Sequence, residues 1–170
     1  MTTGDLPHFT LDVPGPEDAE DLARVHVDAW RAAYTGLMPE RFWDEETQAR
    51  RTTGWRRRLA GDPAEIAEHV RIVRDAAGCA QGFCWVGPAR DEEAPRELQL
   101  WALNVAPALF GSGAGHALVE DLLGQRPAYL WVAEGNARAR RFYVKHGFAP
   151  DGGVLVDPDL EGLREIRMTR

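Results

Sequence analysis

The chain has 170 residues, 44% of them hydrophobic and 28% charged, a size and composition that fit one globular domain with its own core. Its formal net charge of −7 argues against general binding to nucleic acid or to an anionic membrane, because both favour basic proteins. No apolar run approaches the roughly 18 residues of a membrane span, and the first residues lack the basic and apolar regions of a signal peptide. We therefore expect a cytoplasmic protein with neither a membrane nor a nucleic-acid partner.

Apolar residues that alternate predict strands, and apolar residues three and four positions apart predict helices. Residues 1–7 show neither pattern and are expected to be a flexible tail before a single domain over 8–170. In chain order, the predicted elements are a strand over 8–13, helices over 17–34 and 40–60, strands over 69–75, 81–87 and 98–105, a helix over 113–124, a strand over 128–132, a helix over 136–147, and strands over 148–156 and 163–169. The order β-α-α-β-β-β-α-β-α-β-β predicts a mixed sheet with helices, and hence an α/β or α+β fold.

Two cysteines, Cys79 and Cys84, lie on one predicted hairpin. No histidine or further cysteine stands near them at zinc-ligand spacing, so we interpret them as two small thiols and expect no metal in the protein.

Three glycines, Gly111, Gly113 and Gly115, separate the strand over 98–105 from the following helix. A dinucleotide-binding fingerprint fails here, because its third glycine would fall on His116 and because five residues stand between strand and glycines. A phosphate-binding P-loop fails as well, since no Gly-Lys-Ser/Thr ends the segment. Two interpretations stay open: an anion site made of backbone amides at a helix start, and a plain turn from strand to helix.

The second half of the chain carries a further pattern. The strand over 98–105, the loop FGSGAG at 110–115, the strand over 128–132 and the segment EGNARARRFYVKHGF together resemble the GNAT superfamily of acyl-CoA-dependent N-acyltransferases. In that family a Q/R-x-x-G-x-G/A loop is followed by N-x-x-A-x-x-x-Y and then G-F; these positions hold Asn136, Ala139, Tyr143, Gly147 and Phe148 here. The segment VHVDAWRAAYTGLMP at 25–39 and the end of the chain are similar to the family as well, so the resemblance covers about residues 10–170.

The resemblance implies a mostly antiparallel, twisted sheet of about seven strands with about four helices. It implies that acetyl-CoA is the cosubstrate and that the backbone of Leu103, Asn104 and Val105 pairs with the pantetheine arm. The amides of the following loop would hold the pyrophosphate: Phe110, Gly111, Ser112, Gly113, Ala114 and Gly115. Asn136 would hydrogen-bond the cofactor, and Tyr143 would protonate the departing CoA thiolate, a role for which a phenol keeps its proton at neutral pH.

Two positions depart from the family pattern. Phe110 stands where the loop usually begins with Gln or Arg, which removes one side-chain contact near the phosphates but leaves the backbone in place. Gln99 stands where many members carry a glutamate base on the fourth strand. Glu97, two residues earlier, is our predicted catalytic base, with His26 and Glu40 as alternatives; a surface carboxylate or a half-buried histidine without a catalytic role stays open for each.

The first-helix region and the strand edges are expected to line the acceptor pocket. Trp30, Tyr34 and Trp101 are the predicted pocket residues, because aromatic surfaces bind apolar or cationic groups. For each of them, packing in the core is the alternative.

The sequence therefore predicts an N-acetyltransferase that moves acetyl from acetyl-CoA to a primary amine of a small molecule, by direct attack in a ternary complex. It does not name the amine. A homodimer is expected because dimers are common in the family. Two alternatives stay open: a protein or peptide N-acetyltransferase, and a non-catalytic acyl-CoA-binding module, which Gln99 in the base position keeps in consideration.

Overall fold

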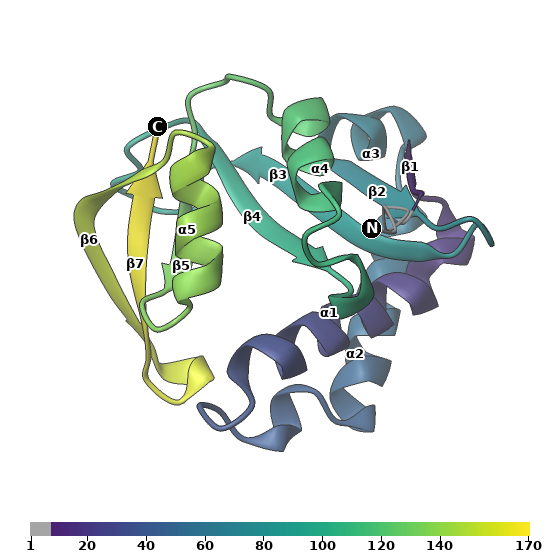
Figure 1. Cartoon of the computed structure of the whole chain (residues 1–170), viewed down its shortest axis with the longest axis horizontal. Coiled ribbons are helices and arrows are strands. Elements are labelled where there is room, and N and C mark those ends of the chain that lie inside the picture. The colour runs from purple at the N-terminus through teal and green to yellow at the C-terminus, as the bar shows by residue number, and fades with distance from the viewer. Residues whose placement is uncertain (1–7) are drawn as a thin grey trace, which may run out of the picture. The chain divides into compact units, whose positions relative to one another are not determined.

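The computed structural model describes residues 8–170 (Figure 1). The tail predicted for residues 1–7 lies outside the described residues. The helices are α1 (Ala19–Tyr34), α2 (Glu45–Leu59), α3 (Pro63–His69), α4 (Ala114–Leu122) and α5 (Ala137–Lys145). The strands are β1 (Thr10–Asp12), β2 (Val70–Arg74), β3 (Ala80–Pro88), β4 (Leu98–Val105), β5 (Tyr129–Ala133), β6 (Ala149–Asp157) and β7 (Leu163–Thr169). Short 3-10 helices include η1 (Pro16–Asp18), η2 (Glu40–Phe42), η3 (Pro107–Leu109) and η4 (Pro158–Leu160).

The seven strands are hydrogen-bonded in the order β1-β2-β3-β4-β5-β7-β6. β4 and β5 are parallel, whereas β1–β2, β2–β3, β5–β7 and β6–β7 are antiparallel. This confirms the predicted α/β class with a mixed, mostly antiparallel sheet of seven strands. One helix more than expected is present, α3, which Asp62 caps through a hydrogen bond from the amide of Ala64 at 2.9 Å.

The chain divides into two compact units, each described by itself. The first comprises the chain up to Trp85 and Ala102–Gly124, and the second comprises Val86–Trp101 and Gln125–Arg170. The prediction of a single domain over 8–170 stays a prediction.

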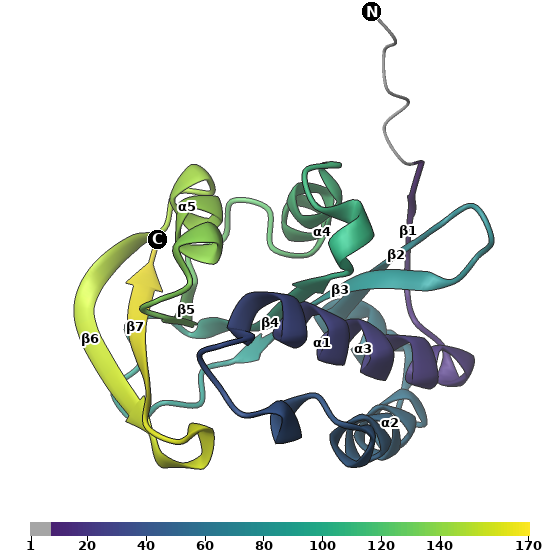
Figure 2. The ribbon, with the colours of Figure 1, turned by 60° about the horizontal axis from the view of Figure 1, so that its bottom comes forward.

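In the first unit, α1 and α2 lie side by side (Figure 2), and α4 packs against β2. The core between α1, α2 and the strands is apolar, because α1 turns one face of small and branched residues inward. Its buried members include Leu22, Val25, Trp55, Ile72 and Phe83.

A buried ion pair joins the start of α1 to β2. Asp18 is 3% exposed, and its two carboxylate oxygens accept hydrogen bonds from Nη1 and Nη2 of Arg74 at 2.6 and 2.9 Å. Asp18 also accepts a bond from the amide of Gly15 at 2.8 Å, and Nε of Arg74 donates to Asp12 at 2.6 Å. The bond from Arg74 lowers the pKa of the Asp12 carboxyl below its usual value. One guanidinium therefore holds η1 and β1 to β2.

In the second unit, β7 lies between β5 and β6, with Trp131 opposite Arg167 and Val154 opposite Ile166. Most of β6 is exposed. α5 ends at Lys145, and Gly147 just beyond it has a φ of +82°, which favours glycine over any other residue.

Asp18→Ala is expected to lower the free energy of unfolding by about 1.5–3 kcal/mol, because it removes the bidentate partner of Arg74 while the bond from Arg74 to Asp12 remains. Chemical denaturation measures this. The matched control is Glu20→Ala, two residues after Asp18, which breaks an exposed pair with Arg56 and is expected to change the unfolding free energy by about 1 kcal/mol or less. Equal losses in the two variants would contradict the importance of the buried pair.

Candidate active site

The end of β4 lies close against β3 through its backbone. A Cβ added at Gly82 of β3 would lie 2.9 Å from Cγ2 of Val73 and 3.2 Å from the carbonyl oxygen of Asn104, so glycine avoids crowding where the two strands meet. The amide of Ala106 donates to the carbonyl of Gln81 at 2.7 Å. Leu103, Asn104 and Val105 are half-buried where β4 ends.

The loop between η3 and α4 takes backbone conformations that glycine favours. Gly111 and Gly113 have φ angles of +81° and +90°, and Gly113 is the N-cap of α4. Ser112 fixes the turn, because its hydroxyl donates to the carbonyl of Leu109 at 2.7 Å and accepts a bond from the amide of Ala114 at 3.2 Å.

The amides of the three loop glycines, Gly111, Gly113 and Gly115, make no hydrogen bond to the described residues. Unpaired amides at the start of a helix, together with the positive end of its dipole, attract an anion. The loop therefore has the chemistry of a phosphate cradle.

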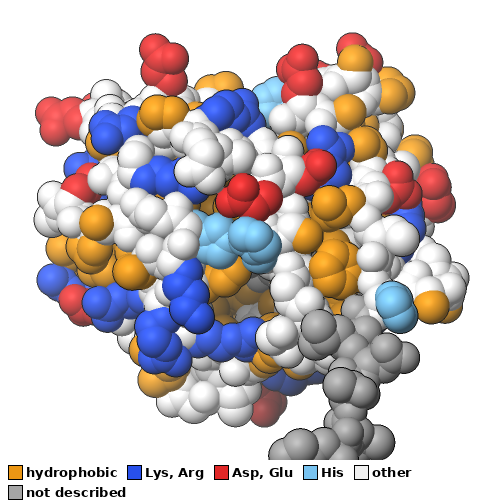
Figure 3. Space-filling model, turned by 45° about the horizontal axis from the view of Figure 1, so that its top comes forward, with side chains coloured by type: hydrophobic (Ala, Val, Ile, Leu, Met, Phe, Trp, Pro, Cys, Tyr) orange, Lys and Arg blue, Asp and Glu red, His pale blue; other side chains and the backbone are white. Residues whose placement is uncertain are grey.

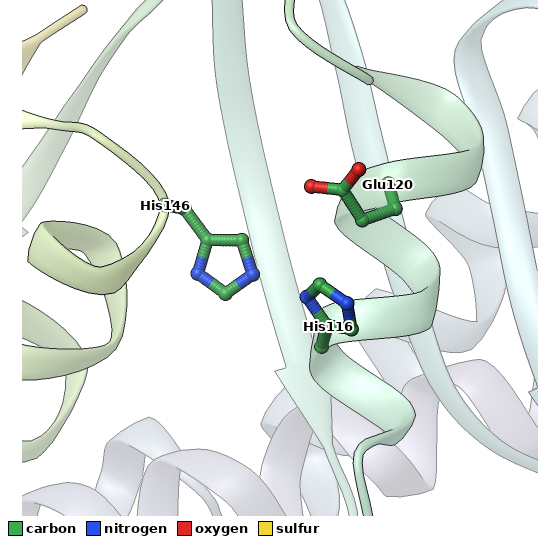
Figure 4. A group of neighbouring side chains, drawn as sticks. All are labelled: His116, Glu120 and His146. Atoms are coloured by element: carbon green, nitrogen blue, oxygen red, sulfur yellow. The ribbon is translucent and has the colours of Figure 1, made fainter.

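α4 continues with polar residues on an exposed face. His116 and Glu120 are exposed and lie one turn apart on this helix (Figure 4). His116 occupies the position where a dinucleotide fingerprint would need its third glycine, and it lies inside the helix.

In the second unit, α5 carries the Asn-to-Tyr motif. The side-chain oxygen of Asn136 accepts a bond from the amide of Ala139 at 3.0 Å, so this oxygen caps the helix. Tyr143 is 9% exposed, with its ring 5.5 Å from that of Phe142 and 5.9 Å from that of Phe148.

α5 is also basic. Lys and Arg side chains gather on the α5 side of the face drawn in Figure 3. The helix contributes Arg138, Arg140, Arg141 and Lys145. At its end, Nδ1 of His146 lies 2.9 Å from the carbonyl oxygen of Phe142.

The residue in the expected base position, Gln99, has a structural role. Its side-chain oxygen accepts hydrogen bonds from the hydroxyl of Tyr129 at 2.9 Å and from the amide of Arg90 at 3.1 Å. The amide of Asp91 reaches the same hydroxyl at 3.4 Å, and Nε1 of Trp131 donates to the Asp91 carboxylate at 2.8 Å. Burial raises the pKa of Tyr129, so its hydroxyl stays a donor. Gln99 and Tyr129 thus hold the segment between β3 and β4.

Glu97 lies at the end of that segment, immediately before β4. Its side chain is exposed, and its carbonyl accepts a bond from the amide of Ala89 at 2.8 Å. Glu97 and Gln99 therefore differ in environment: one carboxylate faces solvent, and one buried carboxamide holds a loop.

The predicted pocket residues fall into two groups. In the first unit, the rings of Trp30 and Tyr34 on α1 lie 5.2 Å apart, edge to face. In the second unit, Trp101 packs its indole so closely on Gly87 that a Cβ there would lie 2.2 Å from the ring, and Arg90 stacks on it at 3.7 Å. Trp30 and Tyr34 are half-buried, as is Trp101.

Similarity to known proteins identifies the family. A model of the acetyltransferase (GNAT) family matches residues 24–148. The chain belongs to this family. It is a GNAT N-acetyltransferase, with an acyl-CoA as cosubstrate.

Several relatives of modest identity are named as acetyltransferases. The uncharacterized N-acetyltransferase YuaI of Bacillus subtilis strain 168 is 32% identical over 127 residues, covering 71% of this chain and 69% of that one. The probable N-acetyltransferase Rv2775 of Mycobacterium tuberculosis is 28% identical over 162 residues, covering 87% and 84%. A mycothiol acetyltransferase of Salinispora arenicola is 31% identical over 129 residues, which are 72% of this chain but 41% of that protein.

Solved structures share the fold. The PaiA N-acetyltransferase of Thermoplasma acidophilum, solved in complex with coenzyme A, superposes with a TM-score of 0.73 at 16% identity and covers 96% of this chain and 98% of its own. At that identity the likeness shows the GNAT fold alone. None of the helices described for this GNAT chain is long and apolar enough to span a membrane.

His26, an alternative base, lies on α1 in the first unit and is half-buried. Its ring packs 5.7 Å from the rings of both Trp30 and Phe83, and Arg51 donates from Nη1 to its Nδ1 at 3.2 Å. Arginine has no acceptor, so Nδ1 must be the unprotonated nitrogen. Burial, and then the charge of Arg51, lower the pKa of His26 to about 3. His26 is therefore neutral at physiological pH, and the lone pair on its Nδ1 is already engaged.

Arg51 is a residue that sequence reasoning missed. It lies on α2, in an arginine-rich segment where every arginine looks like part of a solvated helix face. Only the packing of α2 on α1 distinguishes it.

The free energy of unfolding is expected to fall as the pH drops from 6.5 toward 3, because in this window the unfolded chain binds a proton at His26 that the folded chain excludes. This contribution is fully present above pH 6.5 and has a slope of at most about 1.4 kcal/mol per pH unit. Denaturation curves of wild type and His26→Gln measure it, since glutamine can still accept the bond from Arg51. The variant should show a shallower acid dependence; parallel curves would contradict the lowered pKa.

Proposed function

We propose that the protein transfers an acetyl group from acetyl-CoA to a primary amine of a small molecule, by direct attack in a ternary complex. The observation that carries this proposal is the loop in the family-matched segment, where the amides of Gly111, Gly113 and Gly115 are left without partners. Backbone amides at a helix start can bind the pyrophosphate of CoA without any basic side chain, so Phe110 at the head of the loop is compatible with this role. Ser112 supports the turn, and Ala114 begins the helix.

The backbone of Leu103, Asn104 and Val105 pairs with the pantetheine arm in the manner of an added strand. The Gly82–Asn104 approach supports this role, because it fixes the backbone of this end of β4. Asn136 orders the start of α5 through its side-chain oxygen, which leaves its side-chain amide as the group that hydrogen-bonds the cofactor.

The chemical step needs a neutral amine, a polarised thioester carbonyl and a proton for the leaving thiolate. The amine nitrogen attacks the carbonyl carbon, the C–S bond breaks, and Tyr143 gives its phenolic proton to the CoA sulfur. Glu97 takes the amine proton through water. Its exposed carboxylate supports this role, whereas the carboxamide of Gln99 holds a loop and cannot act as a base. The acceptor lies against Trp30, Tyr34 and Trp101.

The hydrogen bond between Gln99 and Tyr129 weakens the case for a non-catalytic acyl-CoA-binding module. A glutamine in the base position suggested a protein that binds acyl-CoA without turnover. The two hydrogen bonds that Gln99 accepts give this residue a structural reason to be present, independent of catalysis. The homodimer, the cytoplasmic location and the absence of a metal stay predictions.

Gly113→Ala is expected to weaken binding of CoA about tenfold or more, because an L-residue at a φ of +90° carries strain of about 1–3 kcal/mol and shifts the amides around it. Isothermal titration calorimetry with CoA measures this. Gly78→Ala is the matched control: its φ of +84° imposes the same strain in the β2–β3 turn, and nothing lies within 4 Å of an added Cβ at either glycine. Equal CoA affinities in the two variants would argue against the cradle, and wild-type protein that does not bind CoA would remove the proposal.

Tyr143→Phe is expected to lower kcat about 100-fold or more while the Kd for CoA stays within a factor of a few, because general acids act in the transition state. Release of CoA thiol from acetyl-CoA, with a panel of primary amines as acceptors, gives the rates. Val144→Ala on the same helix is the control, since Val144 is 57% exposed and packs little. A turnover unchanged by Tyr143→Phe would assign Tyr143 to packing with Phe142 and Phe148.

A further inference from the structure

Arg51 on α2 places a positive charge against α1. The residue is half-buried. Its guanidinium carbon lies 5.1 Å from the centre of the Trp30 ring, and its Nη1 donates to Nδ1 of His26 at 3.2 Å. Trp30 in turn packs edge to face on Tyr34 and stacks on Phe42 of η2 at 6.5 Å. The cation therefore sits beside the aromatic residues expected to contact the acceptor.

This guanidinium has no carboxylate partner among the described residues. Its Nε is buried without any hydrogen bond, and the hydrogen bond that the guanidinium makes to the described residues is the one from Nη1 to His26. The neighbouring arginines of α1 and α2 differ from it in this respect. Four of them lie within 4 Å of a carboxylate: Arg24 with Asp21, Arg31 with Asp28, Arg50 with Glu46 and Arg56 with Glu20.

The surroundings leave the charge of Arg51 uncompensated. Burial and the nearby Arg50 lower the pKa of its guanidinium to about 10, so it remains protonated at neutral pH. His26, its one side-chain hydrogen-bond partner, is neutral there. The face of Trp30 and the lone pair of His26 stabilise part of this charge, and an anion would compensate the part that burial leaves unpaired.

We propose that Arg51 binds a carboxylate on the acceptor, so that the preferred acceptors are small amines that also carry a carboxylate. This rests on the proposed transfer to a small-molecule amine and narrows its class. A guanidinium and a carboxylate match in charge and in planar geometry, whereas a phosphate dianion would leave one negative charge unpaired. α1 also contacts η3, the segment between β4 and the glycine loop. The helix beside Arg51 is thus in contact with the proposed cofactor site within one unit.

The experiment compares amines in matched pairs, each common amino acid and its carboxamide, which are close in size and shape and of which only the amino acid carries the negative charge. Saturation-transfer NMR, with CoA present, measures binding of each pair without requiring turnover, and thiol release from acetyl-CoA gives kcat and KM where turnover occurs. Wild type is expected to favour the carboxylate member of at least one pair by about 10- to 100-fold, the range for a charge-assisted hydrogen bond.

Arg51→Met keeps the aliphatic stem and removes the charge. It should raise KM for the preferred carboxylate amine about 10- to 100-fold, leave kcat within a few-fold, and leave the carboxamide unaffected. Arg51→Lys should be intermediate, since it keeps the charge and loses the planar donors. Arg50→Met is the control, because Arg50 is exposed and already paired with Glu46, and it should retain the preference. Thermal unfolding and CoA affinity of every variant check that the fold is intact.

The outcomes separate the two proposals. Failure of wild type to bind CoA, or turnover of no amine, would count against the proposed function. CoA binding with equal affinity for the two members of every pair would overturn the carboxylate site alone. A carboxylate preference that persists in Arg51→Met would likewise overturn the role of Arg51.

Discussion

Backbone that leaves a sheet must find new partners for its N–H groups or keep them for a ligand, and this constraint shapes the centre of the first unit. β4 is held to β3 up to Ala106, where the amide still reaches Gln81. Ser112 then satisfies the turn into α4 with its hydroxyl. Gly111 and Gly113 adopt left-handed conformations that direct the remaining amides away from protein acceptors. Any helix start leaves amides for solvent or for a ligand, and an anion is the ligand that these amides and the helix dipole favour.

The chain is acidic overall, yet its charge is distributed by local pairing. Arginines on α1 and α2 mostly meet carboxylates from the same two helices, and Arg74 is enclosed by Asp12 and Asp18. These pairs use much of the negative charge of the region within the protein. The net charge of −7 therefore says little about which groups bind near Arg51. At Arg51 the local charge is positive, which supports the proposed anionic group on the acceptor.

Local patterns predicted the fold well because strands and helices repeat over a few residues. The alternation in the last strand predicted its bounds, 163–169, and the helical pattern of α1 predicted its end at Tyr34. α3 was missed because this helix has only seven residues, beginning with a proline, and its spacing of apolar residues is too short to recognise. The loop glycines and the Asn-to-Tyr motif were visible because their spacing is local as well.

The roles of Gln99 and Arg51 could not be predicted in the same way. Gln99 acts through Tyr129, which lies 30 residues away, and Arg51 acts through His26, which lies 25 residues away. In the sequence, one is a strand residue at a position where the family often has a base, and the other is one of many arginines. Their roles follow from packing that brings a hydroxyl to an amide, or a guanidinium to a ring nitrogen. Tertiary contacts of this kind leave no periodic trace in a single sequence.

Recognition of the acceptor and chemistry on it are carried by different kinds of interaction. A carboxylate on Arg51 is bound equally in the ground state and in the transition state, because its charge does not change as the thioester is attacked. Such uniform binding lowers KM and leaves kcat unchanged. In the proposed mechanism Tyr143 gives a proton only as the sulfur leaves, so its contribution would appear in kcat. Substitution of Arg51 could therefore change which acceptor is bound without disturbing the glycine loop or α5. This separation gives a physical reason why one fold can serve many acceptors, and why the acceptor must be read from α1 and α2 instead of from the motif that identifies the family.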